Sequence, residues 1–547
     1  MHPMNHGYAW GKRPAITQRH TDADVTAQLL SASQERYVKR TRRSRSRSPG
    51  TTLRRPYDKE IVILIIVLLV VSIASLYAAG VLFMVAWSRN STRPRPGSSL
   101  LSKDHNLVLP PDSSAGSSGS LPRYLSYLPH SGFHNQRIAL ENALVLAQLL
   151  NRTLLIPPIR LGAPLAYYPF DELYDMVANS TKAGLGHCSS KLQYDSNYPP
   201  ECEDYQSYTH IPWDWLIDLS NISNWQPLLS GWNFTDAWLQ DTLNLLAAED
   251  IFRLKDDSRH QYAFQDFFSL DPPGRKFSES VHIAALLRRP ERLIMLGTLF
   301  GSSRLHLRSE EHFLFRGRVR EQMVFTNAHL VDVAGAIRTA LGGSYLAVHL
   351  RIGDGSFEVN ATNIVRRSWW KLLQVGLEFS DEEILELEEE SFPDEDNSEP
   401  PIFAPDLPAL RSPHPPLLPF PSNATPTSEF PCRGRLHSAP RLRRLNAPLY
   451  IATDATSPSL NPLLWRFLRT FPCSFFLEDF AEQTRPLDAL RSEVDGVPLG
   501  SFLMPFVEAM VAGQAWQVIG TESSTFSAFV TDVLWRRYHG FQIVQRG

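Results

Sequence analysis

The hydrophobic pattern is clearest at residues 134–158, where a helix-like segment leads into a strand-like one. Leu140, Leu144, Ala147 and Leu150 recur at helical spacing, and the apolar run RTLLIP follows them. Spacing of this kind predicts one buried helix face. A short apolar run that ends in prolines predicts a buried strand.

Three later segments have the same strand-like character. They are SYLAVHLRI at 344–352, PLYIATD at 448–454 and WQVIGT at 516–521, each short, apolar and followed by a polar turn. Strands that alternate with helices in this way predict a parallel α/β fold. In such folds ligand-binding groups gather just beyond the carboxyl ends of the strands.

A much longer apolar run, without a charged side chain, occupies the 27 residues 61–87. At ~1.5 Å per helical residue it can cross a hydrocarbon core of ~30 Å. A signal peptide would have a shorter apolar stretch nearer the terminus. We therefore predict one transmembrane signal anchor, with a buried core helix as the weaker alternative.

Basic residues near this run predict its orientation. Seven Lys/Arg lie in the 20 positions before it and four in the 20 after it, and residues 1–60 carry 13 Lys/Arg against 5 Asp/Glu. The positive-inside bias places the N-terminus in the cytosol and residues 88–547 across the membrane. The chain is thus expected to be a single-pass type II membrane protein.

Glycosylation sequons and cysteines agree with this orientation, because all of them follow the apolar run. The seven sequons begin at Asn90, Asn151, Asn179, Asn221, Asn233, Asn360 and Asn423. Four cysteines on an oxidising side of a membrane predict two disulfides. Of the three possible connectivities, Cys188–Cys202 with Cys432–Cys473 is the least demanding.

Segments without hydrophobic periodicity flank and interrupt the folded part. Residues 1–60 predict a disordered cytosolic tail, and the Ser/Pro/Gly-rich residues 88–120 a flexible stem. The string RRSRSRS at 42–48 could bind RNA or anionic lipid or be phosphorylated. A solvated retention or topology signal is the favoured interpretation, so no nucleic-acid partner is expected.

A compositionally distinct segment lies at about 378–445. Residues 381–399 hold 11 acidic residues and no Lys/Arg, and residues 393–440 hold 13 prolines. Such a segment is expected not to bury enough apolar surface to become ordered. We predict a disordered surface insertion; an acidic patch for a basic partner is the less favoured alternative.

Candidate chemistry lies at two strand ends. The sequence AVHLRIGDGSF supplies His349, Arg351 and Asp354, and the first two share a strand face because they are two residues apart. Arginine offers a planar fork of donors suited to phosphate oxygens. A salt-bridged structural arginine is the competing interpretation.

The second strand end is rich in hydroxyls. In VIGTESSTFSAFV, Gly520 is followed by hydroxyl side chains at positions 521, 523, 524, 525 and 527. Free N–H groups and hydroxyls at a helix start can bind an anion. An ordinary N-cap with spare hydroxyls would have the same sequence.

Taken together, five blocks of the sequence resemble the GDP-fucose protein O-fucosyltransferases. The blocks are GFHNQ (132–136), LLNRTLLIPP (149–158), HLRIG (349–353), YIATD (450–454) and SSTFSAFV (523–530), in the order and spacing of the family apart from the insertion. Residues 160–340 add little to the resemblance.

The resemblance implies a GT-B-like fold, in which two Rossmann-like domains face each other across a cleft. Residues 121–340 would form the acceptor-side domain and residues 341–547 the GDP-fucose-binding domain. It also implies an inverting reaction without a metal or other cofactor. The sole Asp-x-Asp string after the apolar run, at 394–396, lies within the insertion.

The resemblance also assigns roles to individual residues. Arg351 would stabilise the leaving diphosphate, and Asn135 would project into the cleft near the reacting sugar. His349 and Asp454 would hold ribose and guanine. The phosphate-binding positions would be Ser524, Thr525 and the Phe526 amide, and Ser527 would be a further GDP-fucose-binding residue.

Two positions depart from the family pattern. His134 replaces a glycine, and it is either a base or, as we favour, only an imidazole at the helix start. Some relatives supply a glutamate near this point, but residues 121–140 contain no carboxylate. Asp354 lies one residue closer to the arginine than the family's aspartate, so its role is open.

The predicted activity is transfer of fucose from GDP-fucose to Ser/Thr hydroxyls of proteins in the secretory pathway, at an endoplasmic reticulum or Golgi membrane. One alternative is a fucosyltransferase that acts on glycans. Another is an inactive membrane-anchored homologue that binds a partner through the cleft. The sequence does not identify the acceptor.

Overall fold

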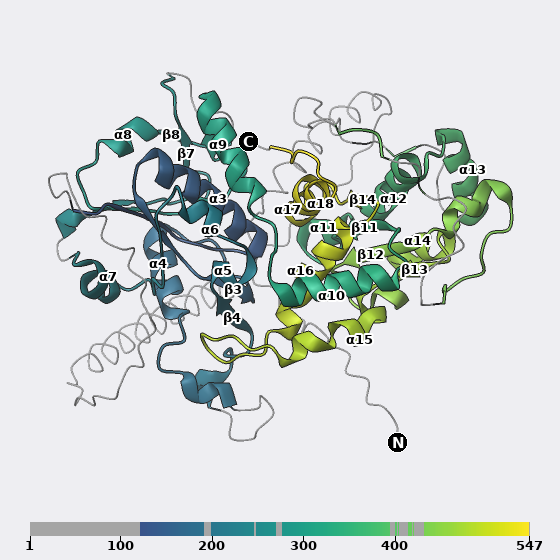
Figure 1. Cartoon of the computed structure of the whole chain (residues 1–547), viewed down its shortest axis with the longest axis horizontal. Helices are drawn as coiled ribbons and strands as arrows, with labels where there is room; N and C mark the ends of the chain where they lie inside the picture. The colour runs from purple at the N-terminus through teal and green to yellow at the C-terminus, as the bar shows by residue number, and fades with distance from the viewer. Residues whose placement is uncertain are drawn as a thin grey trace, which may run out of the picture. The chain divides into compact units, whose positions relative to one another are not determined.

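The computed structural model describes residues 121–547 except 191–198, 246–247, 270–275, 394–399, 402, 404–413, 418–419, 421–430 and 546–547. Its two largest sheets are entirely parallel, which confirms the predicted α/β class (Figure 1). The predicted tail, transmembrane helix and stem lie outside the described residues. Within those residues, no helix has both the length and the apolar character needed to cross a membrane.

The first sheet has the strand order β5-β2-β1-β9-β6. Its strands are β1 (Tyr124–Tyr127), β2 (Thr153–Ile156), β5 (Leu228–Ser230), β6 (Ile251–Leu254) and β9 (Leu293–Leu296). Helix α3 (Phe133–Leu149) joins β1 to β2 and packs on both. The predicted face of Leu140, Leu144, Ala147 and Leu150 is buried, so the helix and the strand predicted here are confirmed.

The second sheet has the order β13-β12-β11-β14. Its strands are β11 (Leu346–Leu350), β12 (Leu449–Thr453), β13 (Ser474–Phe475) and β14 (Gln517–Gly520), so the three strands predicted from the later apolar runs are confirmed. Along β11, Val348 contributes to the core beneath α12 (Ala361–Lys371), whereas Ala347 contributes to the core beneath α16 (Gly500–Gly513). His349 therefore belongs to the α16 face.

Shorter elements complete the described part of the chain. The minor strands are β3 (Ile159–Gly162), β4 (Tyr208–Ile211), β7 (Tyr262–Gln265), β8 (Glu279–His282) and β10 (Leu305–His306). The helices before β11 are α4 (Phe170–Asn179), α5 (Trp213–Leu216), α6 (Ser220–Ser223), α7 (Asp236–Leu243), α8 (Ile283–Leu287), α9 (Glu310–Glu321) and α10 (Ala328–Ala340). Those after it include α11 (Gly355–Val359), α13 (Asp381–Ser391), α14 (Trp465–Thr470), α15 (Ala481–Thr484), α17 (Thr525–Phe529) and α18 (Trp535–Tyr538).

The predicted division into two domains at 340/341 falls between α10 and β11. Residues 120–547 belong to one compact unit, and one hydrophobic core includes Leu125 of the first sheet and Ala347 of the second. The boundary between two domains therefore remains a prediction, and one hydrophobic core continues across it.

Both disulfides follow the predicted pairing. Cys188 is bonded to Cys202, and Cys432 to Cys473. The second bond ties Cys432, near the end of the proline-rich segment, to Cys473, the residue just before β13. The far end of the insertion is therefore fixed to the second sheet.

The prediction of disorder across 378–445 is wrong at both ends, because residues 381–391 form helix α13 and residues 440–446 form a 3-10 helix in which Leu445 is buried. Ser380 and Glu383 make a capping box, and Ile384 and Leu387 are buried. Glu388 is fully buried and accepts hydrogen bonds from Arg366, Arg466 and the indole of Trp370. Partners supplied by α12 and α14 make this acidic segment stable, and composition alone cannot reveal them.

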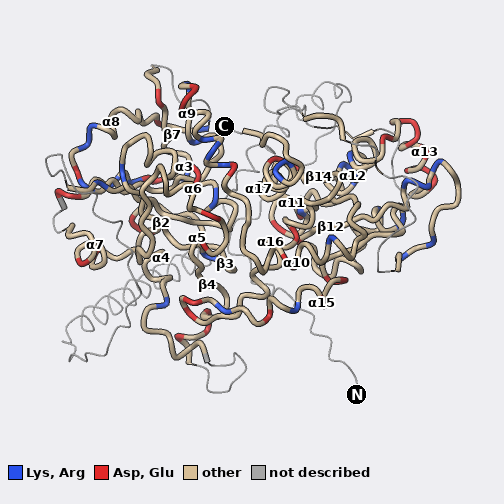
Figure 2. The backbone as a smooth tube through the Cα atoms, viewed as in Figure 1, with Lys and Arg blue, Asp and Glu red and all other residues tan. Residues whose placement is uncertain are grey.

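The outer side of α13 is also paired with basic residues. Arg441 contacts Glu386 and Glu390, and Arg444 contacts Glu383. Acidic and basic stretches of the backbone lie near each other around α13 in Figure 2. The positively charged residues just before β12 thus neutralise much of the helix. Arginines therefore already occupy several of the carboxylates that an acidic docking patch for a basic partner would need.

Candidate active site

Arg351 lies just beyond the carboxyl end of β11. Its backbone N–H donates to the hydroxyl of Thr521, which fixes the end of β11 to the loop after β14. Its guanidinium donates to both oxygens of Asp354, at 3.1 and 2.8 Å. The side chains are 33% and 58% exposed, so water reaches this ion pair and an anionic ligand can compete for the arginine.

His349 is buried on the same face, where Nδ1 lies 2.6 Å from the hydroxyl oxygen of Ser527. Its ring stacks on Phe526 with the centroids 4.3 Å apart. Burial, and then the positive charge of Arg351, lower the pKa of His349 to about 3. The imidazole is therefore neutral at physiological pH and can bind a ligand through hydrogen bonds and stacking, but not through charge.

Asp454 positions the loop that carries Arg351. One carboxylate oxygen accepts the backbone N–H groups of Ile352 and Gly353, at 2.7 and 2.9 Å. A Cβ on Gly353 would lie 2.6 Å from the Asp454 carbonyl oxygen, so glycine is required at that position. Burial raises the pKa of Asp454, and the two N–H donors oppose the rise.

The hydroxyl-rich loop after β14 is held by its own hydrogen bonds. Ser523 has a left-handed backbone with φ of 64°, and Ser524 caps α17 by accepting the N–H of Ser527. The Ser527 hydroxyl in turn accepts the N–H of Thr521. The hydroxyls of Ser524 and Ser527, both predicted to contact the donor, are thus buried within the loop, where they fix the start of α17.

Helix α17 continues into a π-helical turn, Val530–Leu534, and then into α18. Turns of this kind are rare in proteins overall, and those that do occur often lie at functional sites. Thr525 is the first residue of α17, and Phe526 is the second. These two predicted positions occupy the first turn, next to the stacked ring of His349.

The start of α3, the helix that follows β1 of the first sheet, lies against α17. The rings of His134 and Phe526 lie 4.7 Å apart between centroids, and those of His134 and Phe529 lie 5.1 Å apart. Phe133 packs on Phe506 of α16. The predicted residues at the two ends of the sequence pattern, 134–135 and 524–527, are therefore brought together in space, with Asn135 directly after His134 in the same turn.

Residues that the sequence interpretation missed support this arrangement. The Arg137 guanidinium lies 4.3 Å from the centre of the Phe529 ring and is ion-paired with Glu141. Glu508 lies within the apolar helix α16, where burial raises its pKa to about 8, with the nearby Asp454 adding to the rise. A single carboxyl in the apolar run GSFLMPFVEAMVAG is the signal that could have revealed Glu508.

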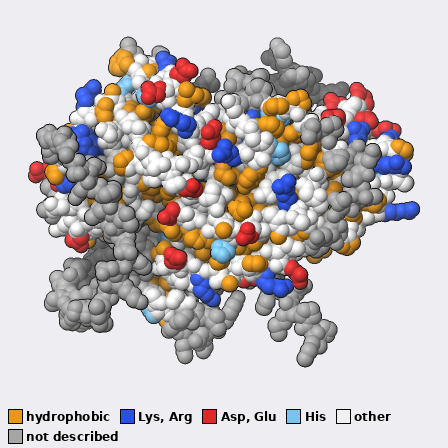
Figure 3. Space-filling view, viewed as in Figure 1, with side chains coloured by type: hydrophobic (Ala, Val, Ile, Leu, Met, Phe, Trp, Pro, Cys, Tyr) orange, Lys and Arg blue, Asp and Glu red, His pale blue; other side chains and the backbone are white. Residues whose placement is uncertain are grey.

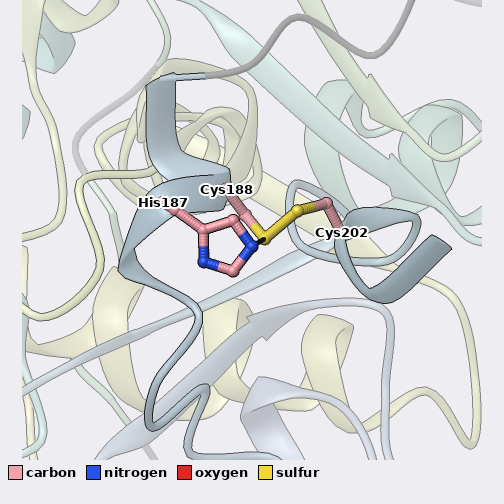
Figure 4. Close-up of side chains that lie close together, drawn as sticks. All are labelled: His187, Cys188 and Cys202. Atoms are coloured by element: carbon pink, nitrogen blue, oxygen red, sulfur yellow. Dashed lines mark hydrogen bonds between the residues drawn. A yellow bond between two sulfur atoms is a disulfide. The ribbon is translucent and has the colours of Figure 1, made fainter. Parts of the chain in front are cut away.

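One group in the described ranges has metal-ligand residue types in close proximity: His187, Cys188 and Cys202 (Figure 4). The two sulfurs are joined to each other, so neither is a thiolate available to a cation. This donor set does not fit a metal site. The Asp-x-Asp string at 394–396 lies outside the described residues.

The visible surface carries both signs of charge. On the face shown in Figure 3, Lys/Arg and Asp/Glu side chains are interspersed and neither forms a continuous field. Nucleic-acid binding requires a contiguous basic surface. The described part of this face offers none.

Comparison with known proteins gave a local match in sequence. No protein-family model matches the chain. Over 37 residues the chain is 60% identical to O-fucosyltransferase 30 of Arabidopsis thaliana, a stretch that amounts to 7% of each protein. The chain thus matches only a small part of that relative's length. The match supports the resemblance to O-fucosyltransferases that the sequence blocks indicate.

Solved structures of POFUT1 were also found. The complex with GDP-fucose aligns with 77% of this chain and 97% of its own, at 12% identity and a TM-score of 0.31. The complex with GDP aligns with 78% and 98%, at 12% identity and a TM-score of 0.34. At these values the alignments carry no conclusion about this chain.

Proposed function

We propose that this protein is a GDP-fucose-dependent O-fucosyltransferase that acts on Ser/Thr hydroxyls of secretory-pathway proteins. The observation that carries the proposal is the meeting of four sequence blocks of that family at one place. The start of α3, the end of β11, the end of β12 and the loop after β14 are linked by the contacts of His134, Arg351, Asp454 and Phe526.

In the proposed donor complex, Arg351 exchanges Asp354 for the diphosphate. Both ligands accept two parallel N–H bonds, so the fork of the arginine can turn from one to the other without loss of geometry. The diphosphate carries more negative charge than the carboxylate, and it also receives N–H groups from the first turn of α17. Asp354 therefore holds the arginine in place until the donor arrives.

The reaction breaks the bond between the fucose C1 and the β-phosphate oxygen. The acceptor hydroxyl oxygen attacks C1 from the opposite face, so the anomeric configuration is inverted. GDP leaves with the bonding electron pair, and the hydroxyl proton is released. Negative charge grows on the β-phosphate during this step, and Arg351 stabilises it without needing a cation.

The remaining residues bind and orient the donor. The neutral, stacked His349 contacts the ribose. Asp454 keeps the Arg351 loop in position through one oxygen and offers its other oxygen to guanine. Asn135 provides an amide near the sugar, where it can donate and accept hydrogen bonds but cannot act as a strong base.

The finer parts of the proposal follow from sequence features and the family resemblance. They are a GT-B-like pairing of the two sheets, activity without a metal, and a type II anchor at 61–87 in an endoplasmic reticulum or Golgi membrane. Protease treatment of intact microsomes tests the orientation. Only the segment before the anchor should be cleaved, and digestion of residues 88–547 would contradict it.

Mass spectrometry tests the activity and the acceptor class. The full-length chain is incubated with GDP-fucose labelled in the sugar and a secretory-protein fraction, and peptides and enzymatically released N-glycans are analysed separately. Label on Ser/Thr of peptides is expected. Label on released N-glycans alone would favour the glycan-directed alternative, and neither label nor GDP binding would leave the inactive homologue.

A further inference from the structure

The imidazole of His134 lies where the start of α3 meets α17 in the proposed site. It has no hydrogen-bond partner among the described residues. Its Nδ1 atom is buried and unpaired. The ring is half-buried against Phe526 and Phe529, with Phe133 on its own helix also in edge contact. Aromatic rings thus hold the imidazole in place without engaging its nitrogens.

The second nitrogen, Nε2, differs from Nδ1 in its access. It is not among the buried polar atoms that lack a partner, and among the described residues His134 has no hydrogen bond to this atom. Nε2 is consequently the nitrogen that solvent or a ligand can reach. It lies on the imidazole that immediately precedes Asn135, the residue expected beside the reacting sugar.

The charges around His134 keep it unprotonated before the donor binds. Burial lowers its pKa well below the usual range, and the nearby positive charges of Arg137 and Arg351, together with His349, act in the same direction. The charges on neighbouring elements are Arg351 and its partner Asp354 beyond β11, and Arg137 with Glu141 on α3. A bound diphosphate adds negative charge beside Arg351, which raises the proton affinity of His134.

We propose that His134 Nε2 accepts the proton of the acceptor hydroxyl as the acceptor attacks fucose C1, an inference that rests on the proposed function. The hydroxyl oxygen forms the new bond to C1, its proton moves to Nε2, and GDP departs with the electron pair of the broken bond. The imidazolium then returns its proton to solvent. Because the bound donor supplies the negative charge that raises the proton affinity of His134, the imidazole is an effective base only in the donor complex.

Other candidate groups are less suited to this role. Asn135 has an amide, which is not basic at physiological pH. Residues 121–140, which include the start of α3, contain no carboxylate. Glu508 has its pKa raised to about 8, so it holds its proton at neutral pH instead of accepting one.

The test uses the full-length chain, with water as the acceptor and GDP release from GDP-fucose as the readout. His134→Gly, which has the residue usual in the family, should reduce kcat by at least about 10²-fold while GDP affinity changes little. Added imidazole should restore part of the rate in the cavity that remains. His134→Gln, which retains most of the side-chain volume, should be equally slow but not rescued.

The pH profile gives a second, independent readout. Wild-type kcat should fall towards acid pH as His134 becomes protonated in the donor complex, and this limb should disappear in both variants. His187→Ala, which removes an exposed imidazole beside the Cys188–Cys202 disulfide, serves as the control and should keep the wild-type profile.

The outcomes separate this inference from the proposed function. Wild-type protein that neither binds GDP nor releases it from GDP-fucose would contradict the function itself. An active wild type, with His134→Gly retaining the same kcat and the same acid limb, would overturn only the role of His134. Equal loss of GDP affinity and kcat would also overturn it, because His134 would then be a donor-binding residue.

Discussion

Two groups of paired arginine and carboxylate side chains near the second sheet have the same chemistry but differ in burial. Arg351 and Asp354 form one half-exposed pair just beyond the carboxyl end of β11. Glu388 instead lies fully buried between Arg366 and Arg466, which are 19% and 6% exposed at their side chains. Burial decides the difference, because a screened pair exchanges its partner readily and a desolvated one does not.

The buried network has a structural consequence for the site. Arg366 belongs to α12, the helix that follows the Arg351 loop through α11, and Glu388 ties α12 to α13 and α14. Part of the acidic insertion therefore packs on α12, the helix that follows the Arg351 loop through α11.

The largest expected effect comes from breaking the buried network. Glu388→Ala removes the carboxylate shared by two guanidiniums and the Trp370 indole, and should cost about 3–5 kcal/mol of unfolding free energy. Denaturant unfolding followed by tryptophan fluorescence measures it. An unchanged midpoint would show that α13 contributes nothing to the fold.

Removing the exposed carboxylate of Asp354 should have a smaller effect, and it should strengthen GDP binding instead of weakening the fold. Asp354→Asn frees Arg351 and deletes a negative charge beside the diphosphate site, so GDP should bind more tightly, by up to about fivefold. Calorimetric titration with GDP measures the change. Weaker binding would mean that Asp354 orients the arginine towards the donor instead of competing with it.

The smallest effect is expected at the outer, exposed face of α13. Arg441 is 50% exposed and pairs with Glu386 and Glu390, which are also exposed. Arg441→Ala should leave the unfolding midpoint unchanged within error in the same denaturant experiment. A loss comparable to that of Glu388→Ala would show that total charge, and not burial, stabilises α13.

These regions also show how far the sequence can be interpreted. Three strands of the second sheet, β11, β12 and β14, were predictable because they are short apolar runs whose polar ends carry the family blocks, whereas the two-residue β13 was not predicted. The roles of Ser524 and Ser527 were not, since a hydroxyl that caps its own helix has the same sequence as one that binds phosphate. The α13 helix was missed because Arg366 and Arg466, which neutralise Glu388, lie 22 and 78 residues away.

The central claim is that Arg351 stabilises the departing diphosphate, and the most direct measurement compares GDP release from GDP-fucose with GDP affinity in wild type, Arg351→Ala and Arg351→Lys. Arg351→Ala should lower kcat by roughly 10²–10³-fold, about 3–4 kcal/mol, with a much smaller loss of GDP affinity. Lysine should recover little because it lacks the fork, and EDTA should change nothing. Full activity of Arg351→Ala, or strict dependence on a divalent cation, would contradict the account.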